Sequence, residues 1–162
     1  MSVEVRDYVS ISDKLNSFGI SVPNGLSILP NNLATAKSIG DLRQHVESDT
    51  VRTLLKAKKI PYVEIFDEDS QPPYLQQYGF EWFGPTLFIS TGLLLQEPNV
   101  LSITLGIITN YLYDLFKGGK NGKVLLDIIV QQADGSCKEV HYSGSPNGLS
   151  EIAEIVKELS SR

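Results

Sequence analysis

The chain has few of the residues that build disulfide-bonded or zinc-binding proteins. Its 162 residues include one cysteine, Cys137, and two histidines, His45 and His141. A single cysteine excludes an internal disulfide, so the sequence does not indicate a secreted scaffold held by such bonds, and a reducing cytoplasm is the simplest location. A zinc site would need carboxylates from distant segments of the chain. We therefore expect neither a metal nor a cofactor.

The sequence also lacks the short motifs that mark common enzyme families. It contains no GxxxxGK[ST] phosphate loop, GxGxxG turn, GxSxG elbow, HExxH pair or CxxC pair. Cys137 and His141 would lie on one face of a strand, but four residues of strand span about 13 Å, too far for a hydrogen bond. The sequence thus predicts no catalytic residue and favours a non-enzymatic protein.

Positive charge is scarce as well. The 14 Lys and Arg residues are outnumbered by 19 Asp and Glu residues, which gives a formal net charge of -5. An acidic protein repels a phosphate backbone, so we expect no nucleic acid partner unless the strip of Lys56, Lys58 and Lys59 acts alone. The N-terminal segment carries scattered charges and no apolar core of signal-peptide length. We expect the partner to be another protein, as a homo-oligomer or a hetero-oligomer.

Residues 100–117 form the most apolar stretch of the chain. Apolar side chains recur there at steps of three and four, which predicts a helix buried in the middle of the fold. Pro98 and Asn99 suit its start, and Gly118-Gly119 suits its end. A membrane span needs about 20 mostly apolar residues, whereas this stretch is shorter and contains Asn110 and Asp114. We therefore predict a buried helix and no membrane contact.

The last third of the chain predicts a β-hairpin followed by a helix. A loop formed by Ala133, Asp134 and Gly135 sets Ile128 opposite Val140, whereas a two-residue loop would set apolar side chains opposite polar ones. One face of this hairpin is therefore expected in the core. The other face, with Cys137, Glu139 and His141, is expected to be solvated or to meet a partner. Ser145-Pro146 then opens an amphipathic C-terminal helix.

The first two thirds predict shorter elements. We expect a strand near residues 3–6, a helix capped by Ser10 or Ser12 that ends at Phe18-Gly19, and a tight hairpin over residues 20–29 around Pro23-Asn24-Gly25. Residues 33–60 predict one interrupted helix or two helices, with a cap at Ser48-Asp49. Residues 62–66 alternate like a strand, and Gly84-Pro85 divides the aromatic stretch at 80–90. Together these elements predict a single α+β domain over residues 1–162, with a mainly antiparallel sheet covered by the central and C-terminal helices.

Three groups of residues are candidate sites. Trp82 and Phe83 would form a partner-binding anchor if they were exposed together, because aromatic side chains dominate interface hot spots. Glu139 and His141 would contact a partner from the polar face of the hairpin. Asn110 and Asp114, four residues apart on the central helix, would line a pocket near the small-residue loop at 143–148, which could bind an anion at a helix N-terminus.

The arrangement of residues 100–160 resembles small accessory domains that accompany effectors in bacterial conflict and antiphage systems. The resemblance rests on an apolar helix, the hairpin VLLDIIVQQADGSCKEVHYSG with its D-G turn, and a closing acidic helix. It implies a non-catalytic accessory or adaptor role in a bacterial defence or toxin-immunity system. The alternative is a small hydrolase or nucleotide-binding enzyme that uses Asn110, Asp114 and the loop at 143–148.

Overall fold

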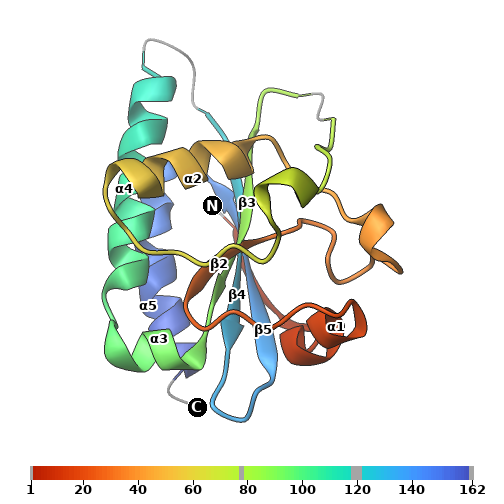
Figure 1. Ribbon diagram of the computed structural model, residues 1–162. Helices are drawn as coiled ribbons and strands as arrows, with labels where there is room; N and C mark the ends of the chain where they lie inside the picture. The colour runs from red at the N-terminus through yellow and green to blue at the C-terminus, as the bar shows by residue number, and fades with distance from the viewer. Residues whose placement is uncertain (1, 77–78, 118–121, 161–162) are drawn as a thin grey trace.

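In the described part of the chain, five strands form one mixed sheet, in the order β1-β5-β4-β3-β2 (Figure 1). The structure, a computed structural model, describes residues 2–76, 79–117 and 122–160. Three of the four strand pairs are antiparallel, and the β3–β4 pair is parallel. The strands are β1 (Ser2–Tyr8), β2 (Leu26–Leu29), β3 (Trp82–Ile89), β4 (Val124–Gln131) and β5 (Cys137–Gly144). The predicted α+β class and mainly antiparallel sheet are confirmed.

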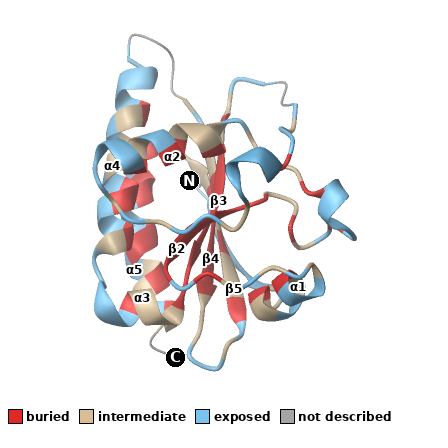
Figure 2. Ribbon diagram, viewed as in Figure 1, coloured by how far each residue is buried: buried red, intermediate tan, exposed pale blue. Residues whose placement is uncertain are grey.

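Helices cover the first face of this sheet. They are α2 (Glu47–Ala57), α4 (Val100–Leu115) and α5 (Leu149–Ser160), and α3 (Thr91–Gln96) precedes α4 in the crossover that makes β3 and β4 parallel. Figure 2 shows that the buried residues of α4 and α5 lie toward the sheet. The core on this face joins the helices to side chains of the central strands, among them Leu87, Ile128, Val140, Leu105 and Val156.

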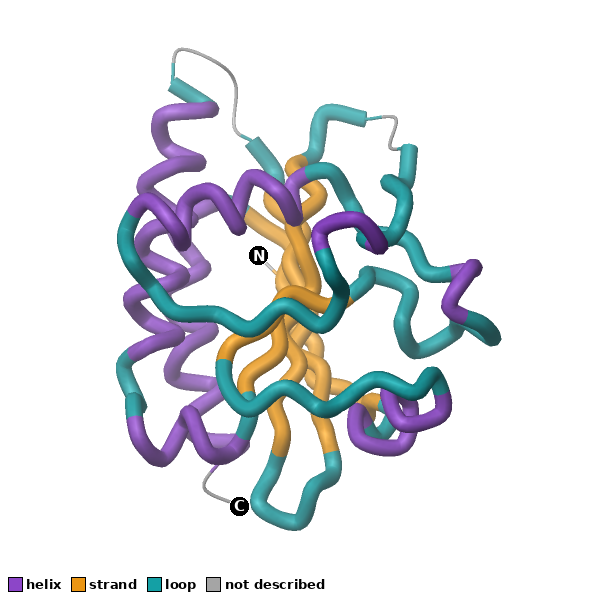
Figure 3. Tube along the Cα trace, viewed as in Figure 1, coloured by secondary structure: helices purple, strands orange, loops and turns teal. Residues whose placement is uncertain are grey.

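The second face of the sheet carries its own apolar core. It is covered by the short helix α1 (Ile11–Ser17) and by an irregular segment that continues from β2 and includes the 3₁₀ turn η1 (Ile39–Asp41). Figure 3 shows this side of the sheet covered mostly by loops. Neighbouring residues of one strand alternate between the two cores, so Ile128 belongs to the first and Ile129 to the second. The second core includes Ile11, Leu15, Leu29, Leu33, Leu42, Phe88, Ile129 and Cys137.

The local predictions for the hairpin and for the N-terminal helix are confirmed, whereas Ser145 makes no capping hydrogen bond and Pro146 opens a 3₁₀ turn before α5. Ile128 lies opposite Val140 in the hairpin, and Gly135 has a positive φ of 89° in the predicted bulge position. The Ser10 side chain accepts a hydrogen bond from the Asp13 amide at the start of α1, and Gly19 closes that helix with φ 73°. Each of these features depends on residues close together in sequence, which is why the pattern alone predicts them.

Two predicted β-structures are wrong. Residues 20–25 form no strand, and β2 (Leu26–Leu29) pairs with β3 and not with a preceding strand. Residues 62–66 make a single bridge, between Val63 and Ser27, where the Val63 amide donates to the Leu26 carbonyl at 2.7 Å. Most apolar side chains of both segments pack on the second core from irregular backbone, and Tyr62 packs on the first, so their pattern is satisfied without a strand. Those on the second core are Ile20, Val22, Ile65 and Phe66.

Several predicted helix features also need correction. Residues 33–60 contain one α-helix, α2, whose first residue is Glu47, so Ser48 lies inside the first turn and is not the cap. Lys59, with φ 58°, follows its end. The central helix α4 was predicted to be buried in the middle of the fold, but it is buried on one side only. Its other side faces outward, and Ile103 there is 51% exposed. Its predicted end at Gly118-Gly119 lies outside the described residues.

The Gly84-Pro85 pair does not divide the aromatic stretch into two elements. Both residues lie within β3, where the register with β4 shifts between Phe83 and Thr86. Such a bulge accommodates a proline, which has no amide hydrogen to donate to the neighbouring strand. Within the described ranges, no helix has the length and apolar character needed to cross a membrane.

The two-core arrangement predicts a specific mutational pattern. Because Ile129 is fully buried in the second core, Ile129→Ala should lower the free energy of unfolding by about 2–5 kcal/mol, as Ile128→Ala should in the first core. Ile103→Ala on the exposed side of α4 is the matched control and should change it by less than about 1 kcal/mol. Urea denaturation measures all three. A near-neutral Ile129→Ala would mean that the second face is solvated.

Candidate functional site

The open part of the second face gathers ionisable side chains from three strands. Strand pairing sets Glu4 of β1 and Asp127 of β4 on either side of His141 of β5, and it sets Arg6 opposite Glu139. Cross-strand neighbours on one face have Cβ atoms about 4.5–5.5 Å apart, so these side chains can interact. We call these five residues, Glu4, Arg6, Asp127, Glu139 and His141, the polar sheet patch.

His141 is oriented by a carboxylate. Its Nδ1 lies 2.5 Å from Oδ1 of Asp127, and both side chains are partly exposed. Because Nδ1 makes this contact, the other ring nitrogen, Nε2, is the one left to contact a partner or solvent. The pair therefore fixes which edge of the imidazole is presented.

Glu139 is the least exposed carboxylate of the patch, with 18% of its side chain accessible. Burial raises its pKa, the charge of Asp127 raises it further, and the nearby Arg6 and His141 oppose these effects. Arg6 Nε lies 3.3 Å from Glu139 Oε1 and 3.7 Å from Glu4 Oε2. Arg6 therefore contacts two carboxylates, and the third, Asp127, contacts His141. With three carboxylates and one guanidinium, the patch is acidic overall.

Two more ionisable groups border the patch. Burial, together with the charges of Glu139 and Asp127, raises the pKa of Tyr8 above its usual range. Burial lowers the pKa of His45, and the charge of Asp127 opposes this shift. The His45 ring packs against Phe83 at 5.5 Å, and its buried Nδ1 has no hydrogen-bond partner in the described part of the chain. His45 is therefore a mainly neutral group at the covered margin of the patch.

The predicted aromatic anchor is not on the surface. Trp82 is 4% exposed and belongs to the first core, where its Nε1 donates to Glu47 Oε2 at 2.9 Å. Phe83 is partly buried and packs against His45. β3 is an inner strand, between β4 and β2, and its side chains enter both cores, such as Leu87 in the first and Phe88 in the second. Trp82 and Phe83 therefore do not form an exposed pair for a partner.

The predicted pocket around Asn110 and Asp114 does not form among the described residues. Both side chains are exposed on the outside of α4. Asn110 lines a cavity of about 260 Å³ between α4 and α5, but Asp114 does not, and the other lining residues are Ser102, Gly106, Thr109 and Ser150. The loop at 143–148 is held by hydrogen bonds from Tyr113 to Asn147 and from Tyr142 to the Ser145 carbonyl. The cavity offers no titratable group for catalysis.

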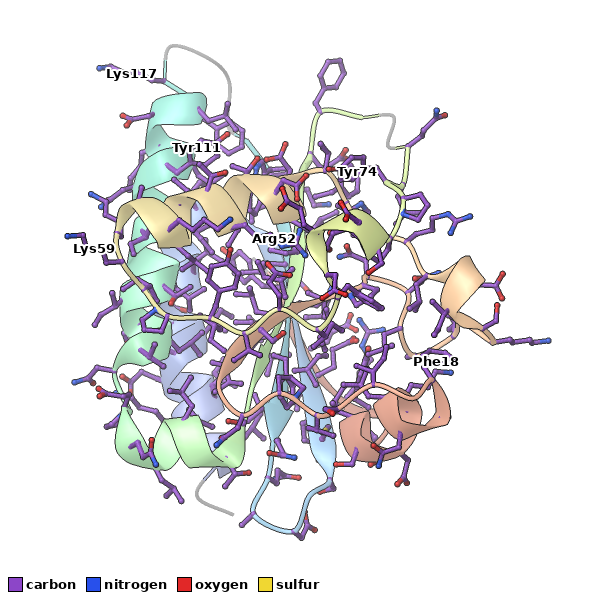
Figure 4. The ribbon with its side chains drawn as sticks, viewed as in Figure 1. Phe18, Arg52, Lys59, Tyr74, Tyr111 and Lys117 are labelled. Carbon is purple, nitrogen blue, oxygen red and sulfur yellow. The ribbon has the colours of Figure 1, made fainter. Side chains whose placement is uncertain are left out.

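A larger cavity, of about 500 Å³, lies beside α2 and is organised by Arg52 (Figure 4). Arg52 is nearly buried, and its guanidinium donates at 2.8–3.3 Å to side chains of α2 and of the segments on either side of it: Gln44, Asp49, Glu64 and Gln71. Tyr74 donates to Asp49 at its rim. With every nitrogen of the guanidinium already bonded, Arg52 ties the irregular segment at 64–74 to α2, and its role is structural.

Neither a metal nor a reactive thiol is indicated. In residues 2–76, 79–117 and 122–160, no group of three or more His, Cys, Asp or Glu side chains is arranged to hold a metal ion. Cys137 is buried in the second core, and burial raises the pKa of its thiol. A protonated, inaccessible thiol is a poor nucleophile.

The patch thus joins the predicted residues Glu139 and His141 to three that the sequence reading missed. Asp127 could have been found, because the correct hairpin register already sets it opposite His141. Glu4 and Arg6 had no such signal, since the pairing of β1 with β5 joins opposite ends of the chain.

No protein-family model matches the chain, and no curated protein or solved structure matches it.

The environment of Glu139 predicts a pH-dependent gain in stability when its charge is removed. The pKa of Glu139 is higher in the folded state than in the unfolded state, so between these two pKa values the folded state binds more protons. The free energy of unfolding therefore falls as the pH rises through this range. Glu139→Gln should therefore raise the melting temperature at neutral pH, and the gain should disappear at a pH below about 4. Thermal unfolding followed by circular dichroism across this range measures the effect.

The matched control is Glu154→Gln, which removes an exposed carboxylate 3.9 Å from Lys157 on α5. Such a surface pair contributes about 0–1 kcal/mol, so this variant should melt close to the wild type at every pH. A Glu139→Gln protein that melts lower than the wild type at neutral pH would show that the Arg6 contact outweighs the cost of burial.

Proposed function

We propose that this protein is a non-enzymatic protein-binding module that contacts a basic segment of another protein through the polar sheet patch. The observation that carries the proposal is that Glu4, Asp127 and Glu139 lie together on the open second face, where Arg6 contacts Glu4 and Glu139 and His141 contacts Asp127. Partly buried carboxylates in excess over their counter-charges are complementary to lysine or arginine side chains.

The cost of holding Glu139 in the free protein supports this proposal. Its carboxylate is disfavoured by burial and by Asp127, so a residue without charge would serve the fold better. Residues that reduce stability are common where they serve binding or catalysis. A basic partner group would supply the charge compensation that Arg6 provides only in part.

We assign this module an accessory or immunity-type role in a bacterial defence or toxin system. The support for this wider role is the resemblance of residues 100–160, in which α4, the β4–β5 hairpin with its Asp134-Gly135 turn and α5 follow in order. The enzyme alternative, a small hydrolase or nucleotide-binding enzyme, has less support, because Asn110 and Asp114 point to solvent and share no cavity.

The proposal is tested by titrating the ¹⁵N-labelled protein with a short arginine-rich peptide and following amide shifts by NMR. The largest shifts should map to β1, β4 and β5 around Glu4, Asp127 and Glu139. A glutamate-rich peptide of the same length should cause none of them. The three exposed carboxylates of Asp67, Glu68 and Asp69 provide an internal control, because charge alone would attract the peptide there equally.

Variants make this test specific to the patch. The combined substitution Asp127→Asn with Glu139→Gln should weaken binding of the peptide by about tenfold or more, because it removes partly desolvated charges. Glu154→Gln, on the opposite side of the sheet, should leave the affinity unchanged. Shifts centred on residues 67–69, or an affinity insensitive to the double substitution, would contradict the proposal.

A further inference from the structure

Strand β1 is an edge of the sheet, and its outer side pairs with no other described strand. It is seven residues long and exposed along most of its length. Val5 is 46% exposed, although its neighbour Val140, on the same face, is fully buried. A long exposed edge is a template for pairing with another chain.

The hydrogen-bond pattern shows which backbone groups of β1 are free to pair. The Gln132 amide donates to the Ser136 carbonyl next to the turn, so the bonded pairs of β4 and β5 continue at alternate residues and include Val130 with Lys138. Consequently Cys137, Glu139 and His141 direct their backbone groups toward β1. Their partners Tyr8, Arg6 and Glu4 receive these bonds. The backbone amides and carbonyls of Val3, Val5 and Asp7 therefore point outward.

We propose that two copies of this chain associate through antiparallel pairing of β1, with Val5 opposite the partner's Val5. In this register Val3 and Asp7 bond to the partner's Asp7 and Val3, so all outward backbone groups of these three residues are used. The two sheets become continuous across a two-fold axis at Val5. The exposed Val5 side chains cover each other on the first face.

Charge selects this register. The two-fold arrangement centred on Val5 sets Glu4 opposite the partner's Arg6, and by symmetry Arg6 opposite the partner's Glu4. A shift of the partner strand by two residues in either direction keeps the outward backbone groups paired. These two registers set Glu4 opposite the partner's Glu4, or Arg6 opposite the partner's Arg6, and like charges directly opposite are destabilising. Both contacts that Arg6 makes with described side chains use Nε, which leaves its terminal nitrogens for the partner's Glu4.

The charges on β1 also favour pairing with β1 of a second copy over pairing with an unrelated strand. Charged side chains normally blunt an edge against foreign strands. In the two in-phase registers next to the proposed one, the segment Glu4-Val5-Arg6 sets like charges opposite each other. In the register centred on Val5, it sets Glu4 opposite the partner's Arg6. Pairing also brings the two polar sheet patches side by side on the second face. The inference goes beyond the proposed function and does not depend on it.

Sedimentation equilibrium combined with amide hydrogen exchange tests the pairing, with any purification tag placed at the C-terminus. The wild type should sediment as a dimer that dissociates on dilution. In the dimer, the Val3, Val5 and Asp7 amides should exchange slowly, and dilution should release them. The Glu4 and Arg6 amides bond to β5 and should be protected in both states.

Val5→Lys sets two like charges opposite each other at the two-fold axis, and it should weaken the dimer by roughly 30-fold or more while the monomer stays folded. Ile103→Lys is the matched control, because Ile103 is about equally exposed, on α4, and it should leave dimerisation unchanged. A wild type that is monomeric at every concentration overturns the proposal. So does a dimer that survives Val5→Lys or in which the Val5 amide exchanges freely.

Discussion

The centre of the sheet is apolar on both faces, and the rest of the molecule is arranged to cover it. β3 and β4 send alternate side chains into two separate cores, such as Ile128 into one and Ile129 into the other. Three long helices suffice for the first face. Among the described residues, α1 and irregular backbone are what covers the second face, and they reach the end of the sheet near Cys137 but leave the polar sheet patch open. The candidate site is the part of that face which remains open.

Irregular backbone can cover a sheet only if its polar groups find partners. Side chains supply many of them here. Asn31 accepts a hydrogen bond from the His45 amide and donates to Thr86 of β3 at 3.1 Å, and the Arg52 guanidinium holds the segment at 64–74 against α2. Such contacts fix loops that have no strand or helix of their own. They also bring His45 to the margin of the polar sheet patch.

The sequence predicts the ends of the chain better than its middle, for a physical reason. The β4–β5 hairpin and α5 are specified by neighbours in sequence. These are the turn at Asp134-Gly135 and the apolar stripe of α5, which follows the 3₁₀ turn at Pro146–Gly148. The segments at 20–25 and 62–66 are short and apolar, and the same pattern suits an edge strand or a loop packed on a core. Only the distant pairing of β2 with β3 decides between them.

The same limit applies to the site. Glu139 and His141 were predicted to lie on a face open to a partner, and the hairpin register already places Asp127 opposite His141. Arg6 and Glu4 enter through the pairing of β1 with β5, which no local pattern encodes. Trp82 and Phe83 were candidates for an anchor only if both were exposed, and the structure does not meet that condition, because Trp82 is 4% exposed. Its burial follows from its place in the first core, where Glu47 of α2 accepts a hydrogen bond from its Nε1.

The reactivity of the single cysteine tests most directly whether the second face is a closed core beside an open patch. Cys137 is 3% exposed beneath α1. In the native protein, a thiol reagent such as 5,5′-dithiobis(2-nitrobenzoic acid) should label it only through unfolding, so the rate should follow the global free energy of unfolding as urea is added. Immediate labelling without denaturant would contradict the account, because the second face would then be open along its whole length.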